Sequence, residues 1–180
     1  MASGKEWPRV AMLAGWIAML AGAVDPLEGS ILIFLGGGLV ALGTLRGQGD
    51  RRLAAYRVWT FALITAGVTA MWVMSAAGGI GGSTGRSMWW GVLILPYLAG
   101  WLMTVWGPGL PRWFSLLGLI VGLWYLAIPL LILARRPASG TGGRGEPGVA
   151  IGLGVVGLLT VAGCVRRLLV RQRQTPAPGS

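Results

Sequence analysis

Residues 113–134, WFSLLGLIVGLWYLAIPLLILA, contain no charged side chain and are rich in leucine and isoleucine. A helix that crosses the hydrocarbon core of a bilayer needs about 20 mostly apolar residues, and this run has the required length. Similar runs lie at about 8–24, 29–45, 57–77, 88–106 and 148–165. The sequence therefore predicts an all-α integral membrane protein, folded as a compact bundle of about six transmembrane helices.

The composition of the whole chain agrees with this fold class. Of the 180 residues, 54% are hydrophobic and 11% are charged, whereas soluble domains have about 25% charged residues. The chain has no histidine, which removes the commonest general base and metal ligand. Cys164 is the only cysteine, so neither an intramolecular disulfide nor a multi-cysteine metal site can form. We expect no cofactor and no metal.

The basic residues predict the orientation of the helices. With a cytoplasmic N-terminus, the outer loops hold four basic residues, Arg86, Arg135, Arg136 and Arg144. The inner segments hold eleven, namely Lys5, Arg9, Arg46, Arg51, Arg52, Arg57, Arg112, Arg166, Arg167, Arg171 and Arg173. Cytoplasmic loops carry such an excess, so both termini are predicted to be cytoplasmic. Residues 1–173 then form a single polytopic membrane domain, and 174–180 form a disordered tail.

The first two runs leave alternatives open. Lys5 and Arg9, an apolar stretch and the small residues 21–23 resemble a signal peptide, whose cleavage would leave five spans. The first two runs are also short enough to form a re-entrant hairpin. We expect an uncleaved first span and six full crossings. Arg greatly outnumbers Lys in an Ala- and Gly-rich background, which is typical of a GC-rich bacterial genome and favours a bacterial inner membrane.

The stretch AVDPLEGSILIF, residues 23–34, carries two of the five carboxylates in the chain. Asp25 at N-cap, Pro26 at N1 and Glu28 at N3 make the pattern of a helix start. A cap explains every residue of the stretch. The alternative is an outer-face site for a cation or cationic ligand, in which Asp25 and Glu28 can also pair with Arg86 on the same side of the membrane.

Two glycine-rich stretches imitate nucleotide-binding loops. AAGGIGGSTGRSMWWG, residues 76–91, lacks the spacing of a phosphate loop and the strand that should precede it. GLGVVG, residues 152–157, lies inside an apolar run with no acidic residue at the required distance. We expect no nucleotide at either. Small residues instead predict close helix packing, at Gly118 and Gly122, at Gly148 and Gly152, and along the stripes Ala11-Gly15-Ala18-Gly22 and Ala62-Ala66-Ala70.

Five aromatic residues fall well inside their predicted spans, namely Trp16, Tyr97, Trp101, Trp124 and Tyr125. Pro96 and Pro129 can each kink the helix that contains them, because proline lacks the backbone N–H and crowds the preceding turn. Aromatic side chains beside kinks can shape a pocket for a flat apolar ligand, such as a quinone, a pigment or a lipid chain. Such side chains equally fill the space between helices without any ligand.

The arginines at 46, 51, 52 and 57 surround the predicted loop between the second and third spans. Each cation near an anionic leaflet contributes about 1 kcal/mol of attraction. Orientation and lipid anchoring suffice to explain these residues. Nucleic acid is not an expected partner, because the basic residues lie between apolar runs instead of on one soluble face.

The predicted span cores hold no Asp, Glu, Lys, Arg or His, which argues against a proton-coupled transporter or pump. We therefore expect a non-catalytic protein: a structural, accessory or assembly subunit of a larger membrane complex. Its partners would be anionic lipids and other membrane subunits or a second copy. The alternative is a small carrier, channel or binder of an apolar ligand that uses the mid-membrane aromatics. A lipid-processing enzyme would have only Asp25, Glu28, Arg86 and Ser87 as a candidate set.

Overall fold

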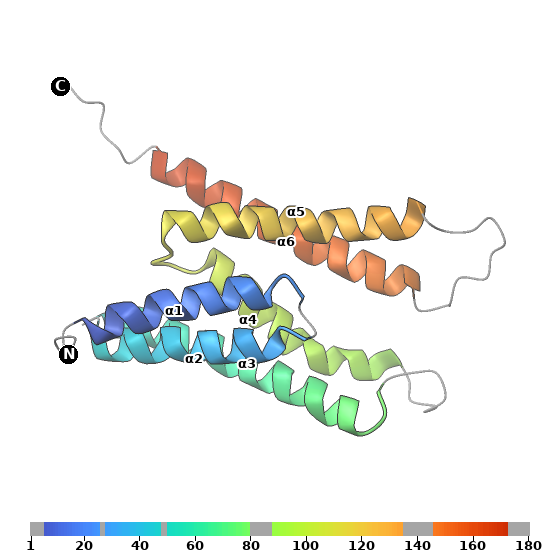
Figure 1. Cartoon of the computed structure of the whole chain (residues 1–180), viewed down its shortest axis with the longest axis horizontal. Helices are drawn as coiled ribbons and strands as arrows, with labels where there is room; N and C mark the ends of the chain where they lie inside the picture. The colour runs from blue at the N-terminus through green and yellow to red at the C-terminus, as the bar shows by residue number, and fades with distance from the viewer. Residues whose placement is uncertain (1–5, 26–27, 48–49, 80–87, 135–145, 173–180) are drawn as a thin grey trace. The chain divides into compact units, whose positions relative to one another are not determined.

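The computed structural model describes residues 6–25, 28–47, 50–79, 88–134 and 146–172. Over this part the chain is helical and contains no strand (Figure 1). The elements are α1 (Trp7–Gly22), α2 (Ser30–Gly47), α3 (Arg51–Ala76), the 3₁₀ helix η2 (Met88–Ile94), α4 (Leu95–Trp106), α5 (Arg112–Ala134) and α6 (Glu146–Gln172). The predicted all-α class is confirmed. The predicted tail at 174–180 and the residues Arg86 and Ser87 lie outside the described residues.

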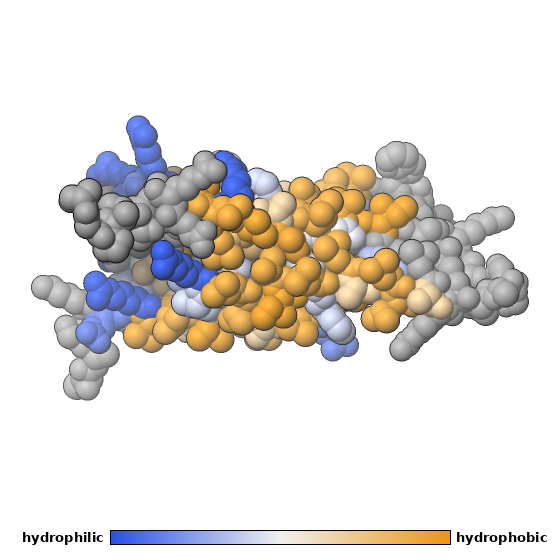
Figure 2. Space-filling view, turned by 90° about the horizontal axis from the view of Figure 1, so that it is seen from above, coloured by the Kyte–Doolittle hydropathy of each residue, from blue (hydrophilic) through white to orange (hydrophobic). Residues whose placement is uncertain are grey.

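Within the described ranges, four helical segments are long and apolar enough to cross a membrane: Ser30–Gly47, Arg51–Ala76, Arg112–Leu131 and Ile151–Val170. Most of their outward side chains are apolar: Trp59 and Ile151 are each 68% exposed. Hydrophobic side chains also dominate the visible surface of the helices in Figure 2. Exposed apolar area on this scale is typical of a protein whose surrounding solvent is lipid. The chain is therefore a multi-pass membrane protein.

The helices form two compact units, residues Met1–Gly109 and Leu110–Ser180. In the first, the N-terminal unit, α1 packs on α2, α2 on α3, and α3 on α4 and η2. In the second, the C-terminal unit, α5 packs on α6. The organisation of residues 1–173 as one continuous membrane domain stays a prediction.

Glycines set the distance between paired helices. A Cβ on Gly15 of α1 would lie 2.6 Å from the carbonyl oxygen of Gly36 in α2, and a Cβ on Gly36 would lie 2.6 Å from that of Gly15. In the C-terminal unit, a Cβ on Gly157 of α6 would lie 2.9 Å from the carbonyl oxygen of Gly122 in α5. Helices in lipid gain van der Waals contact from such close approach. The backbones of both pairs therefore touch.

The alanine stripe predicted on α3 does not form such a contact within the described residues. Ala62 and Ala66 are exposed. The face that packs on α4 instead carries Gly67, where an added Cβ would collide with the backbone of Tyr97. Gly152 of α6 makes no close helix contact either, because no atom of the described residues lies within 4 Å of its Cβ position.

Several helix boundaries differ from the sequence prediction; the largest difference is at α6, which ends at Gln172 instead of 165. The third helix begins at Arg51 instead of 57, because the Oδ1 of Asp50 caps it by accepting from the backbone N–H of Arg52 at 2.9 Å and of Leu53 at 3.3 Å. The fourth predicted span, 88–106, begins as the 3₁₀ helix η2, and α4 itself has only 12 residues. Pro96 lies in the first turn of α4, where its missing N–H costs no hydrogen bond, so it starts the helix instead of kinking it.

Candidate functional site

The polar centre of the N-terminal unit is Arg57. It lies six residues after Arg51 on α3, about 9 Å along the helix axis, and its side chain is 6% exposed. Its place in the sequence beside Arg51 and Arg52 predicts lipid anchoring, like that of the loop arginines. That interpretation is wrong for Arg57, because the guanidinium is enclosed by helices instead of facing lipid or water.

The guanidinium of Arg57 contacts two other helices and one turn. Its Nη1 donates to the hydroxyl oxygen of Thr44 on α2 at 2.5 Å and to the sulfur of Met12 on α1 at 3.3 Å. Its Nη2 donates to the carbonyl oxygen of Gly109, just after α4, at 3.2 Å. Its Cζ also lies 5.3 Å from the ring centroid of Trp16 on α1, a cation–π distance. One side chain on α3 therefore joins α1, α2 and the end of α4.

Local hydrogen bonds and backbone conformation position the groups around Arg57. The hydroxyl of Thr44 donates to the carbonyl of Val40 one turn earlier at 2.7 Å, which leaves its oxygen lone pairs for Arg57. Gly109 has a φ of 77°, a left-handed conformation that favours glycine and that turns the chain after α4. The hydroxyl of Tyr56 donates to the carbonyl of Met103 at 2.6 Å and holds the last turn of α4 against α3.

The guanidinium is not fully satisfied by the residues around it. Nε of Arg57 is buried and has no hydrogen-bond partner among the described residues. No carboxylate in the described part of the chain forms an ion pair with it; its polar contacts are the hydroxyl, sulfur and carbonyl named above. A buried donor without an acceptor costs about 1–3 kcal/mol, and more when it is charged. The unit therefore buries a cation that has no carboxylate partner in the described residues, at a cost in stability.

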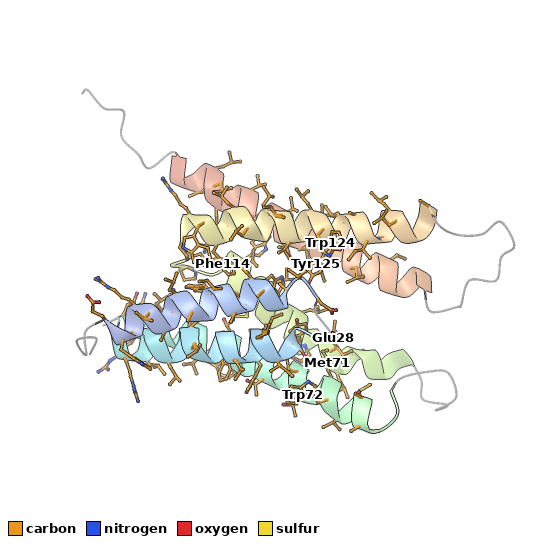
Figure 3. The ribbon with its side chains drawn as sticks, viewed as in Figure 1. Glu28, Met71, Trp72, Phe114, Trp124 and Tyr125 are labelled. Atoms are coloured by element: carbon orange, nitrogen blue, oxygen red, sulfur yellow. The ribbon has the colours of Figure 1, made fainter. Side chains whose placement is uncertain are left out.

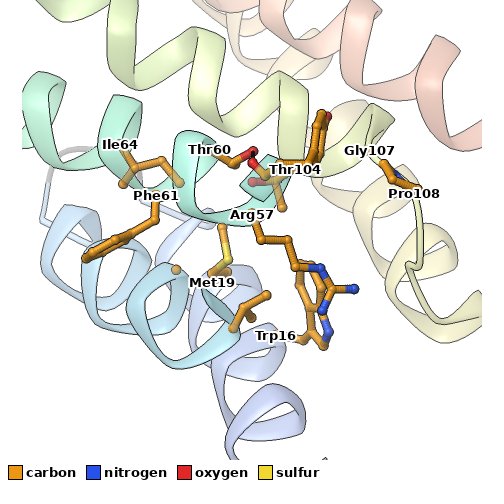
Figure 4. A pocket seen from close by; sticks show the side chains of 12 residues that line it. Trp16, Met19, Arg57, Thr60, Phe61, Ile64, Thr104, Gly107 and Pro108 are labelled. Carbon is orange, nitrogen blue, oxygen red and sulfur yellow. Dashed lines mark hydrogen bonds between the residues drawn. The ribbon is translucent and has the colours of Figure 1, made fainter. Parts of the chain in front are cut away.

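A small recess of about 20 Å³ opens beside Arg57 (Figure 4). Its polar lining comes from Tyr56, Arg57, Thr60 and Thr104. Its apolar lining comes from Trp16, Met19, Gly37, Val40, Phe61, Ile64, Gly107 and Pro108. The hydroxyls of Thr60 and Thr104 each donate to the carbonyl one turn earlier at 2.9 Å. We call this cavity the Arg57 recess.

The five predicted aromatic residues do not line one pocket. Trp16 lines the Arg57 recess. Tyr97 and Trp101 on α4 are buried, but they are absent from the lining of the recess. Trp124 and Tyr125 belong to α5 in the C-terminal unit (Figure 3), where Trp124 is 49% exposed and Tyr125 is buried. The position of these five residues well inside their predicted spans therefore did not show which of them line a common pocket.

Asp25 and Glu28 form a turn before α2. The Oδ1 of Asp25 accepts from the backbone N–H of Glu28 at 3.3 Å, and the carbonyl of Asp25 accepts from the N–H of Gly29 at 2.7 Å. This is the hydrogen bond that a capping residue makes, but α2 begins only at Ser30. The suggested ion pair with Arg86 falls outside the described residues, and a ligand role for either carboxylate stays a prediction. Within the described ranges, no His, Cys, Asp and Glu side chains gather as a metal site.

Comparisons with known proteins add no assignment to this geometry. No protein-family model, no curated protein and no solved structure matches the chain.

Proposed function

We propose that this chain crosses the bacterial inner membrane six times, with both termini in the cytoplasm. The 16-residue α1 is about 24 Å long, shorter than a hydrocarbon core of about 30 Å, but it packs on α2, which is long enough to cross. Contacts at one end of the unit support the orientation: Gly47 at the end of α2 approaches Pro8, and Arg46 lies 5.2 Å above the ring of Trp7. The basic start of α3 follows directly, as the positive-inside rule requires of a cytoplasmic end.

Cysteine labelling tests this topology. In a Cys164→Ser chain, single cysteines at Val24, Ser83 and Ser139 are expected to react with a membrane-impermeant maleimide in intact cells. A cysteine at Gln48 is expected to react only after permeabilisation. Labelling of position 48 from outside would reverse the orientation. A cysteine at Val24 that reacts only from the cytoplasmic side would show that α1 and α2 do not cross the bilayer separately.

We propose further that the chain serves as a non-catalytic structural or accessory subunit of a larger membrane assembly. The observation that supports this role is the outward face of α3. Ala62 and Ala66 are exposed on this face, between the large side chains Trp59 and Val73, which are 68% and 62% exposed. Small residues one turn apart allow another helix to approach closely. Large residues on either side can then pack around that partner helix.

Native mass measurement after extraction in mild detergent tests the assembly role. Wild-type chain is expected to carry additional polypeptide mass, either a partner or a second copy. Ala62→Trp with Ala66→Trp is expected to remove that mass, because the added rings keep a second helix away, while the chain itself stays folded. The matched control is Leu116→Trp with Ile120→Trp on α5, where the exposed residues are already large. A clean monomer of wild type in every mild detergent contradicts the proposal.

A further inference from the structure

We propose that the N-terminal unit fits a bilayer whose hydrocarbon core is about 25 Å thick, and that phospholipids with acyl chains shorter than oleoyl are its preferred lipid partners. This fit requires α1 and α2 to cross the membrane separately, so it rests on the proposed topology. Three features support it: the charges that end the apolar surface of α1 and α2, the alignment of these two helices, and the level of Arg57 on α3.

Charged residues end the apolar surface of α1 and α2 on both sides. On α1 the uncharged run lies between Arg9 and Asp25, and on α2 it lies between Glu28 and Arg46. All four side chains are exposed. At a rise of 1.5 Å per residue, the two pairs are separated by about 24 Å and about 27 Å, whereas an ordinary hydrocarbon core is about 30 Å thick. Neither helix can therefore cross an ordinary core with both of its limiting charges outside it.

The exposed apolar side chains keep within the same limits. Between the charges, they run from Val10 to Val24 on α1 and the turn after it, and from Ile31 to Leu45 on α2. Each band extends about 21 Å along its helix. A stretch that is longer than the core can tilt, but a stretch that is too short is accommodated by thinning of the bilayer or by snorkelling of flanking side chains. A short band therefore favours a thin bilayer.

The two bands are aligned, because α1 and α2 pack as an antiparallel hairpin with matched ends (Figure 1). Near Asp25, a Cβ on Gly22 would collide with the carbonyl oxygen of Gly29. At the opposite end, a Cβ on Gly43 would lie 2.8 Å from the carbonyl oxygen of Pro8. Backbone contacts at both ends fix the register of the helices. The hairpin therefore presents one short apolar band instead of two staggered ones that add up to a longer one.

Arg57 marks the same limit on α3. Its Nη1 donates to the hydroxyl of Thr44 on α2 and to the sulfur of Met12 on α1. Met12 lies about 5 Å along α1 from Arg9, and Thr44 lies about 3 Å along α2 from Arg46. A cation buried at this level costs less in a thin bilayer, because lipid heads and water come closer to it. The third helix therefore favours the same thin core.

The short band belongs to the N-terminal unit. In the C-terminal unit, α5 has 23 residues, of which only Arg112 is charged, and its uncharged run is about 33 Å long. A helix of this length can tilt to fit a thinner core. The preferred thickness is therefore set by α1 and α2, which cannot lengthen.

Quenching of tryptophan fluorescence by brominated lipid tests the fit. Trp113 and Trp124 are the tryptophans outside the N-terminal unit, so a full-length chain with both changed to Phe reports the lipid around that unit. This chain is reconstituted in brominated dioleoyl phosphatidylcholine mixed with one unbrominated phosphatidylcholine. The unbrominated lipids are, in order of increasing thickness, the dimyristoleoyl, dipalmitoleoyl, dioleoyl, dieicosenoyl and dierucoyl forms. The loss of quenching gives the relative affinity for each of them.

Dimyristoleoyl or dipalmitoleoyl phosphatidylcholine is expected to bind best, with at least about twofold higher affinity than the dierucoyl form. Equal affinity along the series would overturn the proposal. Labelling of a cysteine at Val24 separates this fit from the topology on which it rests. If that cysteine reacts from outside and the optimum lies at dioleoyl or longer, the fit alone is overturned. If it reacts only from the cytoplasmic side, the separate crossing of α1 and α2 is overturned and the fit with it.

A double variant tests whether Arg9 and Arg46 limit the band. Arg9→Leu with Arg46→Leu moves the limiting charge of α1 to Glu6, about 5 Å further along the chain. The best-fitting lipid is therefore expected to shift one step toward the dioleoyl form. An unshifted optimum would overturn the proposal. If this variant does not fold, the series with the unaltered arginines still decides.

The matched control is Arg51→Leu with Arg52→Leu, which removes two exposed cations at the start of α3. These residues lie about 8 Å along α3 from Arg57, beyond the level of the band. The optimum is therefore expected to stay where it is without these changes. An equal shift in both double variants would mean that charge loss alone changes the preference, and it would overturn the proposal.

Discussion

Gly15→Leu is expected to separate α1 from α2 and to lower the free energy of unfolding by at least about 3 kcal/mol. A Cβ at this position would lie 2.6 Å from the carbonyl oxygen of Gly36 and 2.8 Å from Cγ2 of Val40. The first atom belongs to a helix backbone, so it cannot move without moving α2. Overpacking costs about 1–3 kcal/mol where side chains can adjust, and more where the backbone must shift. Unfolding in mixed micelles with increasing SDS measures the loss.

The matched control is Gly152→Leu on α6. Nothing lies within 4 Å of the Cβ position of Gly152, so the same change there should alter the unfolding free energy by less than about 0.5 kcal/mol. Equal losses in the two variants would mean that the glycine contact between α1 and α2 does not set their packing.

Arg57→Glu is expected to destabilise the N-terminal unit by at least about 3 kcal/mol. The acceptors that surround Arg57, the oxygens of Thr44 and Gly109, would then face a carboxylate that cannot donate to them. A buried charge without a partner costs several kcal/mol, or the group takes up a proton to avoid it. The thermal unfolding midpoint in detergent, followed by the loss of the monodisperse peak in size-exclusion chromatography, measures the change.

Arg52→Glu supplies the comparison for this charge reversal. Arg52 lies on the same helix and is exposed, and a carboxylate in the first turn of a helix interacts favourably with its dipole. We therefore expect a change of less than about 0.5 kcal/mol. If Arg57→Glu is as stable as Arg52→Glu, the guanidinium does not occupy the enclosed position described above.

Where an apolar run is uninterrupted, the sequence predicts the ends of the helix closely. The run at 113–134 differs from α5 by one residue, because its ends coincide with the ends of its apolar stretch. The start of α3 was missed because Arg51 and Arg52 were interpreted as loop residues. A hydropathy pattern does not detect the N-cap formed by Asp50. This cap allows α3 to begin at the charged residues Arg51 and Arg52, before the apolar run. Apolarity likewise does not distinguish the 3₁₀ geometry of η2 from an α-helix.

The site was missed for a related reason. Arg57 lies at the edge of an apolar run, where a charge is usually assigned to the membrane surface. A signal was nevertheless present, because Arg57, Thr60, Ile64 and Gly67 recur at helical spacing and form the buried face of α3. The aromatic residues illustrate the converse. Their depth in a span was predictable, but depth does not determine which side of a helix carries the ring, as the exposed Trp124 beside the buried Tyr125 shows.

The only thiol of the chain is enclosed between the two helices of the C-terminal unit. Cys164 on α6 is 1% exposed, and its sulfur would lie 3.1 Å from a Cβ added to Gly118 on α5. Separation of α5 from α6 would expose this sulfur to an alkylating reagent. The rate at which wild-type protein is alkylated therefore measures how often that helix pair opens, without any engineered probe.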